Sequence, residues 1–150
     1  GRRGSTQARA NVRDSVDSVS RAVALLYPDV RLDAEGDPAL VARVERQDLD
    51  ELIGNLLENA AKYGGGSVFV TVRREGGMAE ILVEDDGPGI SPTDRVRVID
   101  RGVRLDSNKP GTGLGLAIVR DVAEIYGGSI ALEESEDLGG LLVRLRLPAG

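Results

Sequence analysis

The chain contains no histidine, no cysteine and no tryptophan, and it has a single phenylalanine. Without histidine there can be no Ser-His-Asp triad, no imidazole general base and no histidine-ligated metal. Without cysteine, disulfides and thiolate metal sites are excluded. Few aromatic rings are available to stack on bases, and the net charge of -6 disfavours a nucleic-acid-binding surface. We therefore expect no nucleic-acid partner.

Length and composition predict one domain. The 150 residues are enough for a single core, which must be built from Leu, Val, Ile and Ala. No apolar run approaches the roughly 20 residues of a membrane helix, so we expect no direct membrane contact. Residues 1–7 are interpreted as a flexible leader and residues 8–150 as the folded domain.

The hydrophobic pattern predicts helices that alternate with paired strands. Spacings of three and four predict helices over residues 8–26, 48–62 and 114–126, and residues 92–100 are expected to form a short helix. Short apolar and alternating runs predict strands over 30–33, 40–45, 130–133 and 141–147, and an antiparallel pair around Gly76 and Gly77. This order predicts an α+β, two-layer α/β sandwich, in which helices cover one face of a mostly antiparallel sheet.

Two glycine clusters point to a nucleotide. Residues 85–90 read Asp-Asp-Gly-Pro-Gly-Ile, and residues 111–116 read Gly-Thr-Gly-Leu-Gly-Leu. Glycine lets backbone N–H groups approach a ligand, and Gly115 precedes an apolar helical run whose first turn favours an anion. An acidic residue begins the first cluster and a helix follows the second. This difference would suit a base at the first cluster and phosphates at the second. For either cluster alone, the alternative is that the glycines simply form an ordinary turn or loop.

The common glycine motifs do not fit these clusters. A P-loop requires a Gly-Lys pair, and none occurs in the sequence. A dinucleotide fingerprint requires a third glycine, but that position is Leu116 or Ile118, depending on the register.

The helix predicted over 48–62 has an unusual polar face. Glu51, Asn55, Asn59 and Lys62 fall within about 80° of one another beside an apolar stripe. Asparagine inside a helix costs about 0.6 kcal/mol relative to alanine. A solvated face is one interpretation. The other is a site in which amide oxygens hold Mg²⁺ and Lys62 contacts a phosphate.

Together these segments resemble the ATP-binding domain of bacterial sensor histidine kinases, in the class that includes gyrase, a heat-shock chaperone family and MutL. Residues 51–63 resemble the N box, and the two clusters resemble the first and second glycine boxes. Order and spacing match over about residues 45–147. Residues 83–90 and 100–104 are most similar to PhoQ-type kinases. Residues 99–102 (Ile-Asp-Arg-Gly) lack the Phe of the usual F box, and PhoQ-type proteins have a similar Asp-Arg-Gly.

The resemblance implies a Bergerat fold of about five strands and three main helices, with ATP and Mg²⁺ as cofactors. Asp85 would accept a hydrogen bond from the adenine amino group, although aspartate also starts ordinary turns. Asn55 and Asn59 would hold Mg²⁺. The implied nucleotide-binding residues are Asn55, Asn59, Lys62, Tyr63, Asp85, Gly87, Gly89, Ile90, Arg101, Arg104, Gly111, Thr112, Gly113, Leu114, Gly115 and Leu116. Core packing is an equal alternative for Tyr63.

The implied catalytic residues are Glu51, Lys62 and Arg101. Residues 91–110 would form a lid over ATP, and Arg101 is our first choice among the lid cations to reach the γ-phosphate. Arg104 and Lys109 are the other candidates, and solvated loop charge is the alternative for all three. Glu51 would orient or deprotonate the attacking nucleophile, unless it is only an exposed helix charge.

The resemblance also implies partners. Because the chain has no histidine, the phosphoacceptor must lie on a separate dimerisation domain of the same protein, with a response regulator downstream. Residues 8–27 would lead from that domain or pack on this one. We expect a monomeric fragment of a homodimer, and a cytoplasmic domain of an inner-membrane sensor protein. The alternatives are a serine kinase of the anti-sigma-factor type and a nucleotide-binding interaction module without transfer activity.

Overall fold

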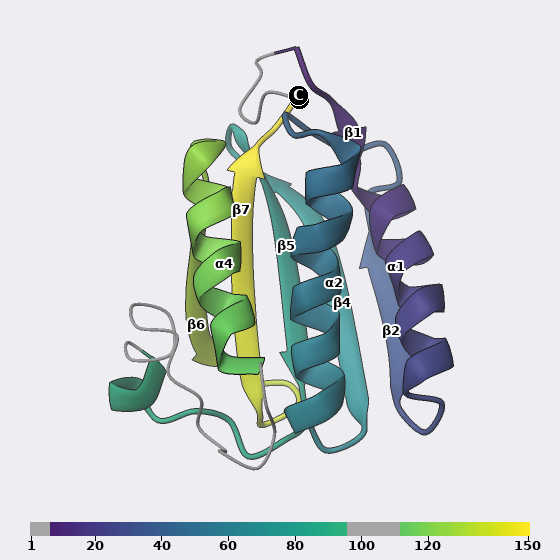
Figure 1. The fold of residues 1–150 in the computed structure, drawn as a ribbon, viewed down its shortest axis with the longest axis vertical. Helices are drawn as coiled ribbons and strands as arrows, with labels where there is room; N and C mark the ends of the chain where they lie inside the picture. Colours follow the sequence, from purple (N-terminus) through teal and green to yellow (C-terminus); the bar gives the residue numbers. More distant parts are fainter. Residues whose placement is uncertain (1–6, 96–111) are drawn as a thin grey trace.

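The computed structural model describes residues 7–95 and 112–150, in which three helices cover one face of a five-stranded sheet (Figure 1). The helices are α1 (Val12–Leu26), α2 (Arg46–Tyr63) and α4 (Thr112–Ile125), and residues 92–95 are also helical. The strands are β1 (Ala10–Asn11), β2 (Arg31–Gly36), β3 (Val41–Ala42), β4 (Ser67–Glu75), β5 (Met78–Asp85), β6 (Ser129–Glu134) and β7 (Leu141–Pro148).

The sheet is mixed and mostly antiparallel, as the sequence predicts. Its strand order is β2-β4-β5-β7-β6, and β1 and β3 form a separate two-stranded sheet. Only the pair of β2 and β4 is parallel, while β4 with β5, β5 with β7 and β7 with β6 are antiparallel. The predicted pair around Gly76 and Gly77 is confirmed as the hairpin of β4 and β5.

The core lies between the sheet and the helices, with α2 between α1 and α4 (Figure 1). The predicted apolar stripe of α2 is buried throughout. It consists of Leu49, Leu52, Ile53, Leu56, Leu57 and Ala60. On the sheet, alternate residues such as Val70, Ile81 and Val83 face the same core, as the period of two along a strand requires. Each large side chain buried in this way contributes about 2 kcal/mol.

The N-terminal elements differ from the prediction. The helix starts at Val12 rather than at residue 8, because Ala10 and Asn11 pair with β3 and the Asn11 Oδ1 accepts a hydrogen bond from the Asp14 N–H at 2.9 Å. The strand predicted over 40–45 is wrong in extent. Only Val41 and Ala42 are extended strand, and they pair with β1 rather than with the main sheet.

One predicted helix end is confirmed and another is corrected. The first helix ends at Leu26, as predicted, and Leu26 is 67% exposed. The third helix starts at Thr112, two residues earlier than predicted, and runs to Ile125. Gly127 then adopts a φ of +81°, a left-handed conformation that favours glycine after a helix.

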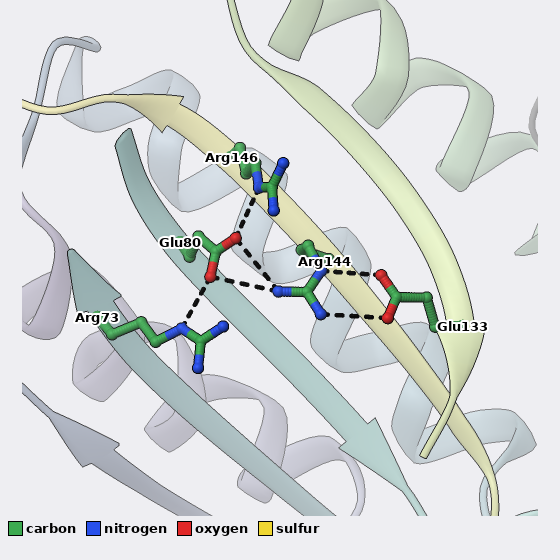
Figure 2. A network of polar contacts seen from close by, with 5 residues as sticks. All are labelled: Arg73, Glu80, Glu133, Arg144 and Arg146. Carbon is green, nitrogen blue, oxygen red and sulfur yellow. Dashed lines mark hydrogen bonds and ion pairs between the residues drawn. The ribbon is translucent and has the colours of Figure 1, made fainter. Parts of the chain in front are cut away.

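The sheet face opposite the helices carries an ion-pair network (Figure 2). Glu80 on β5 is completely buried, although none of the helices described here covers this face of the sheet. It accepts hydrogen bonds from Arg73 Nε at 2.8 Å, Arg146 Nε at 2.6 Å and Arg144 Nη1 at 3.2 Å. Arg144 also binds both carboxylate oxygens of Glu133, at 2.8 and 3.1 Å. The guanidinium groups therefore take the place of a covering layer over the middle of the sheet.

This network determines the charge state of Glu80. Burial by itself raises the pKa of the Glu80 carboxyl, but the hydrogen bonds from Arg146, Arg73 and Arg144 outweigh burial and lower the pKa from 4.5 to about 2. Glu80 is therefore ionised at neutral pH, as a carboxylate surrounded by three arginines should be. None of the helices in residues 7–95 and 112–150 has the length and apolarity needed to cross a membrane.

Candidate functional site

The predicted motifs meet at one end of the molecule. The C-terminal end of α2, the segment that follows β5 and the N-terminal end of α4 all lie at the lower end of the sheet in Figure 1. The turn between β6 and β7 lies at the same end. Four segments far apart in the sequence are thus brought together around the end of β5, where Asp85 is located.

Asp85 is a buried carboxylate in which only one of the two oxygens accepts hydrogen bonds from the described residues. Its side chain is 6% exposed, and its Oδ1 accepts hydrogen bonds from the backbone N–H groups of Gly87, at 2.9 Å, and Leu141, at 3.3 Å. Burial raises the pKa of Asp85, and the two backbone donors partly oppose this rise. Within the described residues its Oδ2 accepts no hydrogen bond. A buried acceptor of this kind suits a ligand N–H donor.

The neighbouring residues hold this loop against the end of α2. Asp86 Oδ1 accepts hydrogen bonds from the backbone N–H groups of Gly65, at 2.9 Å, and Ser67, at 3.0 Å. The hydrogen bond from Ser67 is the largest of the effects that lower the pKa of Asp86. A Cβ on Gly87 would lie 2.6 Å from the Tyr63 carbonyl oxygen, so only glycine fits there. Asp85 and the last turn of α2 are therefore held in close contact.

The polar face of α2 contains the other predicted side chains. Glu51 and Lys62 are exposed, whereas Asn55, Asn59 and Tyr63 are half-buried. Asn55 Nδ2 donates to the Glu51 carbonyl oxygen at 3.1 Å, which leaves the Asn55 Oδ1 without a hydrogen bond among the described residues. Asn59 Nδ2 is buried and has no hydrogen-bond partner within residues 7–95 and 112–150.

These asparagines fit a Mg²⁺-nucleotide. Leaving a buried amide donor unpaired costs about 1–3 kcal/mol, so the Asn59 Nδ2 would gain from an acceptor on the ligand, such as a phosphate oxygen. Neutral amide oxygens are ligands that Mg²⁺ accepts, with water and phosphate oxygens completing its shell.

The predicted phosphate end is described in part. Thr112, Gly113, Leu114 and Gly115 form the start of α4, where the first N–H groups of a helix have no partner within the helix. Leu116 is 4% exposed and belongs to the core. Gly111, Arg101, Arg104 and Lys109 lie outside the described residues.

The remaining predicted residues follow Asp85. Gly89 has a φ of +73°, a left-handed conformation that glycine adopts readily, and Ile90 is half-buried against the core. Both residues lie in the segment that follows β5.

Sequence analysis missed the turn between β6 and β7 as part of this site. Leu141 donates to Asp85, and Gly140 lies directly beside the Asp85 carboxylate. The only signal was the pair Gly139-Gly140, which the sequence presents as an ordinary strand connection. A hydrogen bond between residues 56 positions apart has no local pattern that could reveal it.

The comparisons identify the family. The family model of histidine kinase-, DNA gyrase B- and HSP90-like ATPases matches residues 44–150, and the chain belongs to this family. Among solved structures, the mycobacterial sensor histidine kinase MprB superposes with a TM-score of 0.80 and 28% identity, covering 94% of this chain and 96% of that one. The ATP-binding domain of PrrB from Mycobacterium tuberculosis gives a TM-score of 0.79 and 29% identity, covering 95% of this chain and 97% of that one.

The curated relatives are sensor kinases. Sensor protein kinase CarS of Pseudomonas aeruginosa is 46% identical over 121 residues, which are 81% of this chain and 27% of CarS. The two-component sensor PhoQ of the same organism is 41% identical over 145 residues, which are 95% of this chain and 32% of PhoQ. The expected similarity to PhoQ-type kinases is confirmed. The chain spans 27% and 32% of the length of these two relatives.

Proposed function

We propose that this chain is the catalytic domain of a two-component sensor histidine kinase, which binds Mg-ATP and donates the γ-phosphate to a histidine on a separate dimerisation domain. The observation that carries the proposal is Asp85, a buried carboxylate with one oxygen held by two backbone donors and the other available to a ligand. The adenine amino group is a donor of the kind this acceptor requires. The family match and the sensor-kinase relatives support the same function.

In this proposal the nucleotide lies between Asp85 and the start of α4. Adenine binds at Asp85, Gly87, Gly89 and Ile90, with Tyr63 beside it. The phosphates bind the backbone N–H groups of residues 111–116 and Lys62. Asn55 and Asn59 hold Mg²⁺, which supplies neutralisation of the phosphate charge. Arg101 and Arg104 stay predictions for the γ-phosphate.

Transfer requires little covalent chemistry from the chain. The bond between the γ-phosphorus and the bridging oxygen of ADP breaks, and a bond forms from phosphorus to the acceptor imidazole nitrogen. Glu51 on α2 is exposed and would orient the acceptor imidazole or accept the proton from its other ring nitrogen. The rest is positioning and stabilisation of charge by Lys62 and the helix N-terminus.

The biological setting is part of the proposal. A response regulator would receive the phosphoryl group downstream, and the full-length protein would be a homodimeric inner-membrane sensor with this domain in the cytoplasm. Neither the anti-sigma-factor type of serine kinase nor the interaction module is favoured by the relatives, which are named as sensor kinases.

The test combines binding with transfer. Isothermal titration with Mg-ATP should give one site, and Asp85→Asn should weaken binding at least about tenfold, because one charge-assisted hydrogen bond contributes about 1.5–3 kcal/mol. Incubation with radiolabelled ATP and the dimerisation domain of the parent protein should yield acid-labile phosphohistidine. Acid-stable phosphoserine would indicate the serine-kinase alternative, and binding without transfer the interaction module. Absence of ATP binding would contradict the proposal.

A further inference from the structure

The turn between β6 and β7, residues 135–140, forms one wall of the Asp85 site. A Cβ on Gly140 would overlap both the carboxylate and the carbonyl oxygen of Asp85, and it would come within 2.7 Å of the Gly87 nitrogen. A Cβ on Gly89 would lie 3.7 Å from the Gly140 carbonyl carbon. The backbone of Gly140 is therefore packed directly against the loop of the first glycine cluster.

The turn also determines how the Asp85 carboxylate is oriented. Leu141, the residue after Gly140, donates its backbone N–H to Asp85 Oδ1, the same oxygen that accepts from Gly87. With both donors on Oδ1, the rotamer is fixed and Oδ2 is left for a ligand. If the turn moved away, one of the two orienting donors would be lost.

A buried hydrogen bond anchors this turn to β5. Ser135 is 1% exposed, and its Oγ donates to Glu84 Oε2 at 2.6 Å and accepts from the Leu138 N–H at 3.0 Å. The backbone closes the turn through Ser135 N–H to Gly140 O and Gly139 N–H to Ser135 O, both at 2.8 Å. Glu84 directly precedes Asp85, so the turn is attached to the strand that carries the site.

We propose that the turn of residues 135–140, through Gly140 and the Ser135–Glu84 hydrogen bond, is a positioning and specificity-determining element that holds Asp85 for recognition of the 6-amino group of adenine. This inference rests on the proposed function. The expected discrimination is between ATP and inosine triphosphate, which carries a 6-oxo group in place of the amino group. At the 6-position an oxo group can only accept, so it offers the Asp85 carboxylate no hydrogen bond where adenine donates one, and the N1–H of the oxo base lies one ring position away.

The test uses calorimetry to measure the affinities for ATP and for inosine triphosphate. The four proteins are wild type, Gly140→Ala, Ser135→Ala and Gly77→Ala. Wild type should bind ATP in preference to inosine triphosphate. Gly140→Ala should lower the ATP affinity about tenfold and the inosine triphosphate affinity much less, so that the ratio of the two narrows about tenfold, the effect of one lost hydrogen bond. Ser135→Ala should narrow the ratio about threefold. Gly77→Ala is the matched control, because a Cβ there meets nothing within 4 Å.

The outcomes separate this inference from the proposed function. Thermal melting followed by circular dichroism shows which variants are folded, and Ser135→Ala serves as the test if Gly140→Ala does not fold. Glu84→Gln, which keeps an oxygen acceptor for Ser135, should retain the wild-type ratio. An unchanged ratio in folded Ser135→Ala, or an equal loss for both nucleotides, would overturn the positioning role alone. A wild-type protein that binds neither nucleotide would overturn the proposed function and this inference with it.

Discussion

At the scale of single residues, Glu80 shows how a buried charge is tolerated on a sheet face without a covering helix. Three arginines donate to its carboxylate, and they lower its pKa to about 2 in the folded protein. A folded-state pKa below the unfolded value means that ionised Glu80 stabilises the fold above about pH 4.5. This contribution is lost as the pH falls from 4.5 toward 2.

Replacement of Glu80 by Gln should therefore destabilise the protein by about 2 kcal/mol at pH 7. This is less than the 3–5 kcal/mol of a fully buried pair, because Arg73 and Arg146 are half-exposed. Urea unfolding at pH 7 and pH 3.5 measures the effect, and the difference from wild type should shrink at the lower pH. Glu75→Gln, at the exposed end of β4, is the control. A difference that does not depend on pH would contradict the assigned pKa.

Asn59 differs from Glu80, because its buried amide group lowers the stability of the fold when no ligand is bound. Because its Nδ2 is buried without a partner in the described part of the chain and alanine has a higher helix propensity, Asn59→Ala should change the free energy of unfolding by less than about 1 kcal/mol. The same variant should lose most of the Mg²⁺-dependent affinity for ATP. Calorimetry with and without Mg²⁺ measures this, and Asn11→Ala, at the N-cap of α1, is a control that lowers stability but leaves binding intact.

At the scale of elements, the fit between α2 and α4 depends on a polar contact as well as on apolar packing. The Tyr126 hydroxyl, just after α4, donates a short hydrogen bond to Asp48 at the start of α2, and both residues are buried. The contact anchors the C-terminal end of α4, opposite its glycine-rich start, to the start of α2.

We expect Tyr126→Phe to lower stability by about 1–2 kcal/mol, because the buried Asp48 carboxylate loses a donor. Chemical denaturation measures this loss. Tyr27→Phe is the matched control, since the Tyr27 hydroxyl makes no hydrogen bond among the described residues. Equal effects of the two substitutions would show that the Asp48 contact contributes nothing specific.

Element prediction succeeded where the pattern was local and failed where pairing was decisive. The α2 stripe from Leu49 to Ala60 repeats at helical spacing, and all six of its residues are buried as predicted. Residues 10–11 and 41–42 are strands because they pair with each other, although α1 and β2 lie between them in the sequence. Neither segment has a pattern of its own that would indicate this pairing.

At the scale of the whole molecule, nucleotide binding should be visible as stability. A ligand at 100 times its dissociation constant stabilises the folded state by about 2.7 kcal/mol, and each kcal/mol raises Tm by about 2–4 °C for a domain of this size. Saturating Mg-ATP should thus raise Tm by about 5–10 °C, whereas Mg-GTP should not. A thermal melt of wild type and Asp85→Asn tests this, and an equal shift in both proteins would contradict adenine recognition by Asp85.

The sequence by itself determined the helices, the main strands, the absence of a phosphoacceptor histidine and the three motifs. These depend on residue type and on spacing along the chain. Only the tertiary structure decided that the turn of residues 135–140 meets Asp85, that the Asn59 Nδ2 is buried without a partner among the described residues, and that three arginines enclose Glu80. The physical reason is that these contacts join residues on different strands and helices, and sheet order and packing, rather than local pattern, bring such residues together.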